Sequence, residues 1–232
     1  MKKRKNKTLR IAIAVLGILF CISAVKIGNY FWDAHKSDQF TAELQELVMQ
    51  QTEENVAEAQ SETEKADDDT AAENIAVPVS IPEQIDFAPL QQISGDVKAW
   101  IFSPNTRINN VIAQAQDNEY YLHRLLNGTE TKAGTLFLDY HNQGDFSDWN
   151  TIIYGHHMKN GSMFASLVNY QRQDYYEEHP VMYLYLPGHR YRLDLIAGYT
   201  TGTEDQIYTI PGTASEKQQL AEYAMQRSDF ST

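Results

Sequence analysis

The sequence predicts a mainly β domain, either a barrel or a sandwich, carried behind an N-terminal membrane helix. Three features of the 232 residues lead to this prediction. Short apolar runs bounded by Gly, Pro, Asn and Ser recur through the C-terminal part of the chain, as expected for many short strands. Only one segment there has the clear spacing of an amphipathic helix. Near the N-terminus, an unbroken apolar run follows a basic cluster, which is typical of a membrane segment.

Residues 1–10 are predicted to be a cytoplasmic basic tail and residues 11–32 a transmembrane signal anchor. Six Lys or Arg lie in the first ten positions, and an apolar or small-residue run then extends from Ile11 to Val25. Continued to Trp32, the segment rises about 33 Å as a helix, enough for a hydrocarbon core of about 30 Å. The basic flank places the N-terminus inside the cell and the rest of the chain outside. Cleavage as a signal peptide is the alternative, disfavoured because no clear small-x-small site follows.

Residues 33–81 are predicted to be an acidic stalk or linker. Positions 36–86 contain fourteen Asp or Glu and two Lys, and beyond Glu53 the linker has too few apolar residues to become ordered. A coiled-coil stalk is disfavoured because sustained heptads are absent. Four apolar residues nevertheless have helical spacing, which allows the membrane helix to continue or restart for a few turns. They are Phe40, Leu44, Leu47 and Val48.

The folded domain is predicted to span residues 82–232. A short helix or turn is expected around Ile85 to Leu90, and one or two helical turns at 162–169. Ala214–Arg227 is predicted to be an amphipathic helix capped by Thr213 or Ser215. The expected strands are 97–102, 107–113, 134–139, 150–155, 181–186 and 191–199, the last two forming a hairpin across Pro187-Gly188.

Charge and cysteine content exclude several classes of function. The net charge of −12 argues against nucleic-acid binding, which needs clustered Lys and Arg. The single cysteine, Cys21, excludes an intrachain disulfide and a Cys-rich metal site. Phe20 precedes it and is too bulky for a lipoprotein signal, so Cys21 is predicted to be an inert residue of the membrane helix.

The segment expected to carry chemistry is Ile152–Met158, where a strand passes through Gly155 into His156 and His157. A strand end presents a side chain rigidly, and imidazole titrates near neutral pH. Adjacent strand residues point to opposite faces, so the two histidines cannot share one role and are a poor chelating pair. From spacing alone, structural histidines remain the alternative. A metal site would need other histidines to converge without supporting spacing, so neither metal nor cofactor is expected. They are His141, His179 and His189.

Four sequence blocks carry a resemblance to a known family over about residues 82–230. The longest is Asn150–Met158, continued by Gly161–Phe164; the others are Asp96–Ile101, Asp117–Leu122 and Gly134–Asp139. In order and spacing these blocks resemble the class B sortases, membrane-anchored cysteine transpeptidases of Gram-positive bacteria. The N-terminal anchor and spacer are similar to those of the family as well.

The resemblance implies an eight-stranded barrel with a Cys-His-Arg site. The family's cysteine attacks the carbonyl of a C-terminal sorting motif in a secreted protein, and an amine of the peptidoglycan peptide resolves the thioacyl-enzyme. His156 matches the family's histidine, the general acid and base. Asn118, Leu122 and Tyr154 match positions that line the substrate groove, with packing inside the barrel as the alternative for each. Secreted proteins, the peptidoglycan amine and, through residues 11–32, membrane lipid are the implied partners.

The C-terminal part of the chain departs from the family pattern. The family's nucleophile lies in a Thr-Leu-x-Thr-Cys strand end, with the arginine on a neighbouring strand, whereas no cysteine follows Cys21 here. Arg227 belongs to the helix that precedes those strands, so it is not a candidate for the catalytic arginine. We therefore expect a truncated sortase that is inactive as written and lacks the last strands. A non-catalytic sortase-like binding module, or a decayed gene product, is the alternative.

Overall fold

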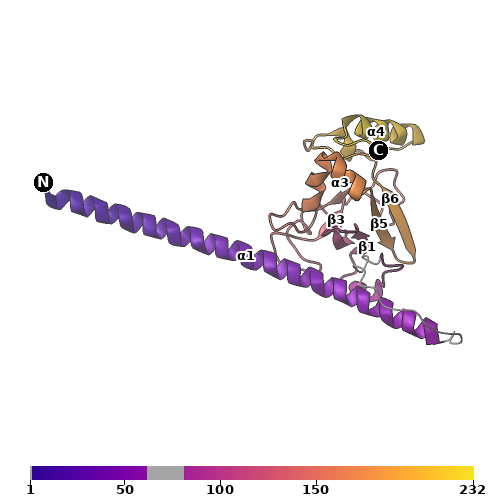
Figure 1. Ribbon diagram of the computed structural model, residues 1–232, viewed down its shortest axis with the longest axis horizontal. Coiled ribbons are helices and arrows are strands. Elements are labelled where there is room, and N and C mark those ends of the chain that lie inside the picture. Colours follow the sequence, from indigo (N-terminus) through magenta and orange to yellow (C-terminus); the bar gives the residue numbers. More distant parts are fainter. Residues whose placement is uncertain (1, 62–80) are drawn as a thin grey trace, which may run out of the picture.

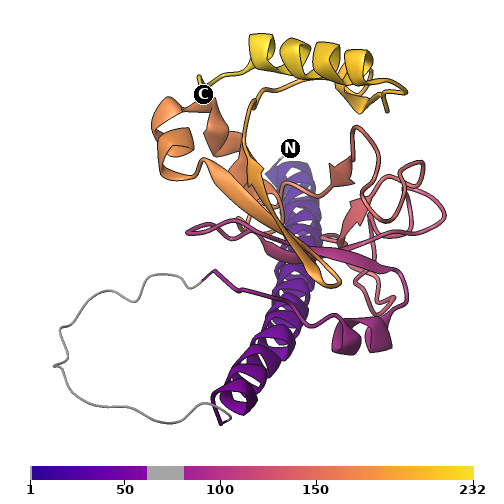
Figure 2. The same cartoon turned by 90° about the vertical axis from the view of Figure 1, so that its right-hand side faces the viewer.

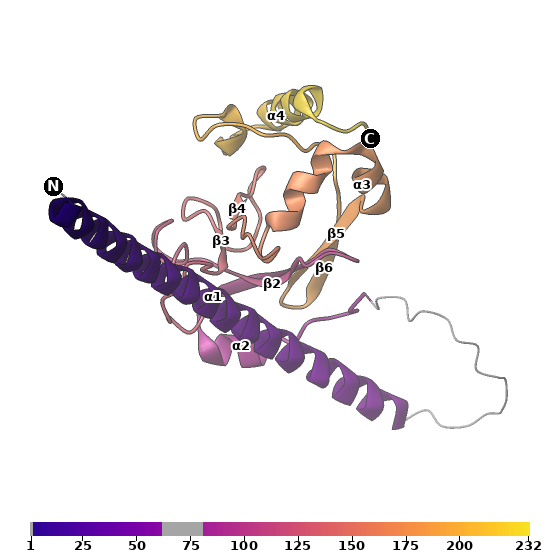
Figure 3. The same ribbon diagram turned by 60° about the vertical axis from the view of Figure 1, so that its left-hand side comes forward.

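The computed structural model describes residues 2–61 and 81–232 and combines one long helix with a curled sheet (Figure 1). The helix, α1 (Lys2–Ser61), has 60 residues and rises about 90 Å. Its N-terminal half projects beyond the domain, while its C-terminal half runs alongside the sheet (Figure 1, Figure 3). By length and composition it is apolar enough to cross a membrane, with a mean hydropathy of 1.8 in the window that identifies Ile13–Val48.

A six-stranded sheet forms the domain, in the order β4-β3-β2-β1-β5-β6. All neighbouring pairs are antiparallel except β2 and β3, which are parallel. The sheet is curled, so the mainly β, barrel-type prediction is confirmed in the form of a half-barrel (Figure 2). The strands are β1 (Val97–Phe102), β2 (Asn109–Ala113), β3 (Leu136–Leu138), β4 (Ile153–Tyr154), β5 (Val181–Leu186) and β6 (His189–Asp194).

The hairpin of β5 and β6 forms where it was predicted, but its second strand begins and ends earlier. Leu186 pairs directly with His189, because Gly188 adopts a positive φ of 78° that suits a two-residue turn. The edge strand β4 contains only two residues, fewer than the six expected at 150–155. A short β4 leaves the chain free to leave the sheet immediately before His156.

Helices flank the sheet on both sides. The helix α4 (Ala214–Arg227) has the predicted bounds and begins with a capping box between Thr213 and Glu216. It lies on the side of the domain away from α1 (Figure 1). The helix α3, whose sequence is mostly polar, was not predicted. The remaining elements are α2 (Ala88–Ile93), α3 (Gln173–Glu178) and the 3₁₀ helices η1 (Ala165–Gln171) and η2 (Gln206–Tyr208).

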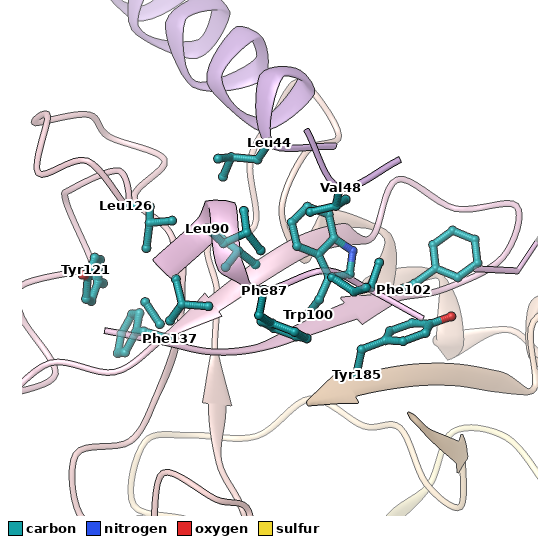
Figure 4. Close-up of a cluster of buried hydrophobic side chains, with 14 residues drawn as sticks. Leu44, Val48, Phe87, Leu90, Trp100, Phe102, Tyr121, Leu126, Phe137 and Tyr185 are labelled. Atoms are coloured by element: carbon teal, nitrogen blue, oxygen red, sulfur yellow. The ribbon is translucent and has the colours of Figure 1, made fainter. Parts of the chain in front are cut away.

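Both faces of the central strand β1 are buried, because its side chains alternate between two apolar clusters. Trp100 and Phe102 belong to one cluster, together with α2 and the C-terminal half of α1 (Figure 4). Ile101 belongs to the other, with η1 and α3. The indole N–H of Trp100 donates to Asn109 Oδ1 at 2.7 Å, which satisfies its buried polar atom.

Part of the predicted linker is packed on the domain. Leu44 and Val48 are 4% and 1% exposed, and both lie in the cluster around Trp100 (Figure 4). Over these turns the membrane helix continues, as the helical spacing of the apolar residues allowed, and its apolar stripe packs on the sheet. Residues 62–80 of the predicted linker lie outside the described residues, and the domain boundary at residue 82 stays a prediction.

Candidate active site

His156 follows the edge strand β4 after a single glycine. A Cβ atom at Gly155 would collide with the side chains of Leu136 and Phe164, so only glycine lets the chain pass this close to the sheet. The backbone N–H of Phe164 donates to the carbonyl oxygen of His156 at 3.0 Å. The histidine is thus fixed on both sides of its own backbone.

The imidazole of His156 has a defined orientation. Its Nε2 lies 2.8 Å from the carbonyl oxygen of Leu122, and since a carbonyl only accepts, Nε2 carries a proton. The ring of His123 stacks on it, with centroids 5.8 Å apart and planes inclined by 25°. Among the described residues Nδ1 has no hydrogen-bond partner.

The two adjacent histidines have different surroundings. His156 is half-buried, whereas His157 is exposed and forms an isolated β-bridge with Met163 through its backbone. This difference agrees with the opposite orientations expected of neighbouring residues in extended chain. The catalytic role of His156 itself stays a prediction.

Asn118 and Tyr154 meet at a third residue, Asp139. The side-chain amide of Asn118 and the hydroxyl of Tyr154 each donate to Asp139 Oδ2 at 2.9 Å. Asn118 Oδ1 in turn accepts from the backbone N–H of Tyr140 at 3.1 Å. Asp139, at the end of β3, is buried and also lies 2.9 Å from Nδ1 of His141. The polar atoms of both predicted groove residues are therefore already used within the domain.

In the cluster around Asp139, the carboxylate is ionised and the tyrosine hydroxyl is protonated at neutral pH. Burial acts to raise the pKa of Asp139, but hydrogen bonds from the backbone and side chain of His141, from Asn118 and from Tyr154 outweigh it and lower the pKa. Burial and the bond to Asp139 raise the pKa of Tyr154. An ionised acceptor with neutral donors orients groups and does not exchange protons. The Asp139 cluster therefore leaves the predicted acid–base role of His156 unchanged as a prediction.

The structure links the four predicted site residues in two pairs, one by a direct contact and one through a shared partner. Leu122 supplies the carbonyl that holds His156, and Asn118 is joined to Tyr154 through Asp139. Leu122 and Tyr154 both pack on the cluster around Trp100. Sequence reasoning missed Asp139 and His123. Asp139 closes one of the sequence blocks, so a signal was present, whereas nothing in the sequence marks His123.

Neither Arg227 nor Cys21 is placed for catalysis with His156. The guanidinium of Arg227 lies over the rings of Tyr199 and Tyr223, at 5.3 and 5.2 Å, and 3.9 Å from Asp205. Cys21 is exposed on the projecting half of α1. Among the residues that the structure describes, no group of three or more His, Cys, Asp or Glu could hold a metal ion.

Comparisons with known proteins identify relatives of this chain, although no family model matches. Two curated relatives do: sortase B of Listeria monocytogenes, 40% identical over 115 residues that cover 50% of this chain and 47% of the relative, and sortase B of Staphylococcus aureus, 31% identical over 119 residues that cover 51% and 49%. The chain thus spans about half the length of the curated relatives it matches.

Solved structures extend the match. The sortase B of Bacillus anthracis in complex with AAEK1 is 30% identical, with a TM-score of 0.67 over 87% of this chain and 84% of that one. The chain belongs to the class B sortases. A sortase B–substrate complex of S. aureus shares the fold at 23% identity, with a TM-score of 0.68 over 87% and 82% of the two chains. Because 87% exceeds the share taken by residues 82–232, the likeness to these sortases includes part of α1.

Proposed function

We propose that this class B sortase chain supplies the histidine part of a cysteine transpeptidase. The enzyme cleaves a C-terminal sorting motif in a secreted protein and joins that protein to an amine of the peptidoglycan peptide. The observation that carries the proposal is the geometry of His156. Its Nε2 is held by the carbonyl of Leu122, and its Nδ1 is left free beside an edge strand.

The proposed reaction uses His156 twice. A cysteine thiolate attacks the carbonyl carbon of the scissile bond, and protonated His156 gives its proton to the leaving amine as the C–N bond breaks. Neutral His156 then takes a proton from the incoming amine, whose nitrogen attacks the thioacyl carbon and releases the thiolate. An arginine near the carbonyl oxygen stabilises the negative charge that develops there.

Among the residues that the structure describes, neither the one cysteine nor Arg227 is proposed as the thiol or the arginine of this reaction. The one cysteine is Cys21 on the projecting half of α1, and Arg227 is engaged with Asp205. We therefore assign both groups to a segment absent from this sequence, which makes the chain inactive by itself. The edge strand β4 supports this assignment, because a strand added along β4 would bring its own residues next to His156.

Asn118, Leu122 and Tyr154 are proposed to contact the sorting motif. The side-chain amide of Asn118 and the hydroxyl of Tyr154 are both hydrogen-bonded to Asp139, so Tyr154 would contact the substrate mainly through its ring. That ring stacks on Tyr208, with centroids 6.5 Å apart. The groove is thus proposed to select shape and apolar contact more than charge at this point.

The proposed location is the cell membrane, with residues 11–32 as a single span. The basic residues before it keep the N-terminus in the cytoplasm and leave the domain outside. The length and hydropathy of α1 support a span. Added protease on intact cells is expected to degrade the domain and to spare residues 1–10, whereas a soluble secreted species that begins near residue 26 would contradict the anchor.

The function is tested in a chain extended after Thr232 by a segment with the family pattern Thr-Leu-x-Thr-Cys and the arginine strand. Cleavage of a sorting-motif peptide is expected to fall roughly 10²- to 10⁴-fold on His156→Ala, the usual contribution of a general acid and base. His157→Ala is the matched control and is expected to cost little, because that side chain is exposed. Equal losses from the two substitutions would overturn the assignment.

A non-catalytic binding module is the second candidate, favoured by the single cysteine at position 21. It predicts that the 232-residue chain itself binds sorting-motif peptides, and that a continuation in the adjacent coding sequence has no Thr-Leu-x-Thr-Cys pattern. Such a pattern directly downstream would decide for the enzyme.

A further inference from the structure

The turn after His156 is attached to α1 by polar contacts that the proposed reaction does not use. We propose that residues 33–48 of α1, the docking segment, position the loop that carries His156, and that Asp38 is the residue through which they act. This inference rests on the proposed function only where it concerns catalysis. The contacts themselves are independent of it.

The docking segment presents one face to the domain. Its buried residues are three, seven and four positions apart, a spacing that places them on a single helix face. They are Ala34, Ser37, Leu44 and Val48. Polar contacts lie along both sides of this face: Asp33 Oδ2 accepts from the backbone N–H of Lys132 at 2.6 Å, and Gln45 Nε2 donates to the carbonyl of Asn109 at 2.7 Å. The position of α1 along the sheet is thereby set at several points.

Residues 156–164 form the histidine loop, which folds back on itself. Phe164 N–H donates to the carbonyl of His156 at 3.0 Å, and residues 157 and 163 form the β-bridge described above. At the tip, Gly161 N–H donates to the carbonyl of Met158, also at 3.0 Å. Because tip and stem are cross-linked by backbone hydrogen bonds, a displacement of the tip is passed to His156.

Asp38 holds the tip through Asn160. Asn160 Nδ2 donates to Asp38 Oδ2 at 3.0 Å, and Arg107 Nη1 donates to the carbonyl of Asn160 at 2.6 Å. Arg107 Nη2 also lies 3.8 Å from Asp38 Oδ2, which closes a triangle of three residues. These three residues come from α1, from the turn before β2 and from the histidine loop, so the triangle ties together distant parts of the chain.

Close apolar packing does not replace these bonds on this side of the loop. A cavity of about 400 Å³ lies between α1 and the loop, lined by Asp38, Thr41, Arg107 and Met163 among others. The side chains of Asp38 and Arg107 are 36% and 57% exposed, so their ion pair adds little. Two charge-assisted hydrogen bonds therefore hold the tip, one from Arg107 to the carbonyl of Asn160 and one from Asn160 to Asp38, and only the second joins the tip to α1.

Hydrogen exchange on the full chain in detergent micelles tests the positioning directly. Asp38→Ala is expected to speed amide exchange of Gly161 and Phe164 about threefold to tenfold, because the loop opens more often once its tip is released. Asp38→Asn should give a smaller increase, since its amide oxygen still accepts from Asn160. Glu43→Gln is the matched control: it removes one charge from an exposed site on the same helix and is expected to change nothing.

Two further results distinguish positioning of the histidine loop by Asp38 from a general loss of stability: the effect of the double variant, and the part of the chain in which amide exchange rises. If Asp38 acts through Asn160, Asp38→Ala should add little in a chain that already carries Asn160→Ala. Additive effects of the two substitutions would overturn the inference. So would exchange that rises equally in β1 and β2, because that pattern indicates a loosened sheet and not a released loop.

The effect on catalysis is measured in the chain extended after Thr232. Asp38→Ala is expected to lower kcat with little change in KM, and Asp38→Asn to restore part of the loss. Unchanged kcat together with faster loop exchange would refute the catalytic importance of the contact. An extended chain that is inactive without any substitution would refute the proposed function alone, because the exchange result on the 232-residue chain would still stand.

Discussion

The two halves of α1 belong to one unbroken helix but bury their apolar side chains differently. In the projecting half, apolar residues occur all round the helix and stay exposed, as Leu16 and Phe20 do at 65% and 75%. In the docking segment they form one stripe, which ends in the buried Leu44 and Val48. A helix that is apolar on every side suits lipid, whereas a stripe needs a protein partner. Periodicity, more than mean hydropathy, therefore tells the two environments apart.

Deletion of one or both halves of α1 is expected to have the largest effect on folding of the domain. Removal of residues 1–32 should leave a soluble domain that unfolds cooperatively, because the residues lost contribute little to its core. A fragment of residues 82–232 should be molten or aggregate, since Trp100 and its neighbours lose the cover of α1. Thermal unfolding and gel filtration would distinguish the two. A sharp transition of a monomeric 82–232 fragment would contradict this expectation.

Single substitutions sharpen the comparison. Leu44→Ala is expected to lower the free energy of unfolding by about 2–5 kcal/mol, the usual range for a buried leucine. Leu16→Ala, the same change in the projecting half, should leave unfolding of the domain unchanged and weaken only membrane insertion. Chemical denaturation in detergent measures the first effect, and flotation with vesicles measures the second. A loss of domain stability in both variants would remove the distinction between the halves.

Acidification should affect the site cluster more than the helix contact. The pKa of Asp139 is lowered in the folded state from an ordinary value of 3.8, so its ionised form stabilises the fold above that value. This contribution is lost as the pH falls below 3.8 and through the folded-state pKa. The side-chain amide resonances of Asn118 should report the change. In Asp139→Asn this pH dependence should disappear, and its persistence would assign it to another group.

The smallest effect is expected from salt. The Arg107–Asp38 pair is exposed and its N–O distance is 3.8 Å, so 1 M NaCl should change the stability of the domain by less than about 1 kcal/mol through this pair. Comparison of the parent chain with Arg107→Gln by denaturant unfolding at low and high salt measures it. A larger salt-dependent difference would mean that charge, and not the hydrogen bond of Asn160, attaches the docking segment.

Local patterns predicted much of the fold. The bounds of α4 follow from its capping residues, and the hairpin of β5 and β6 from Pro187-Gly188. The glycine before His156 predicted a strand end, and β4 does end at Tyr154, where the sheet leaves no room for a side chain at Gly155. These features depend on residues close together in the sequence.

Long-range contacts were beyond the sequence reasoning. Asp38 and Asn160 are 122 positions apart, and an acidic residue in an acidic segment looks the same whether it faces water or a loop. Asp139 was missed for a similar reason, since its partners Asn118 and Tyr154 are 21 and 15 positions away. The length of β4 was overestimated because apolar content predicts burial and not how many residues are paired.

The absence of a break in α1 has a mechanical consequence for the site. Six residues separate Trp32, the last residue of the predicted span, from Asp38, and six helical residues rise about 9 Å. A continuous helix has no flexible joint, so a membrane span that ended at Trp32 would fix the height of the histidine loop above the bilayer and its orientation relative to the span. Each residue inserted between these two positions would lift the site by about 1.5 Å and turn it by about 100°. One added residue would therefore change both the height of the site and the direction it faces relative to the membrane helix.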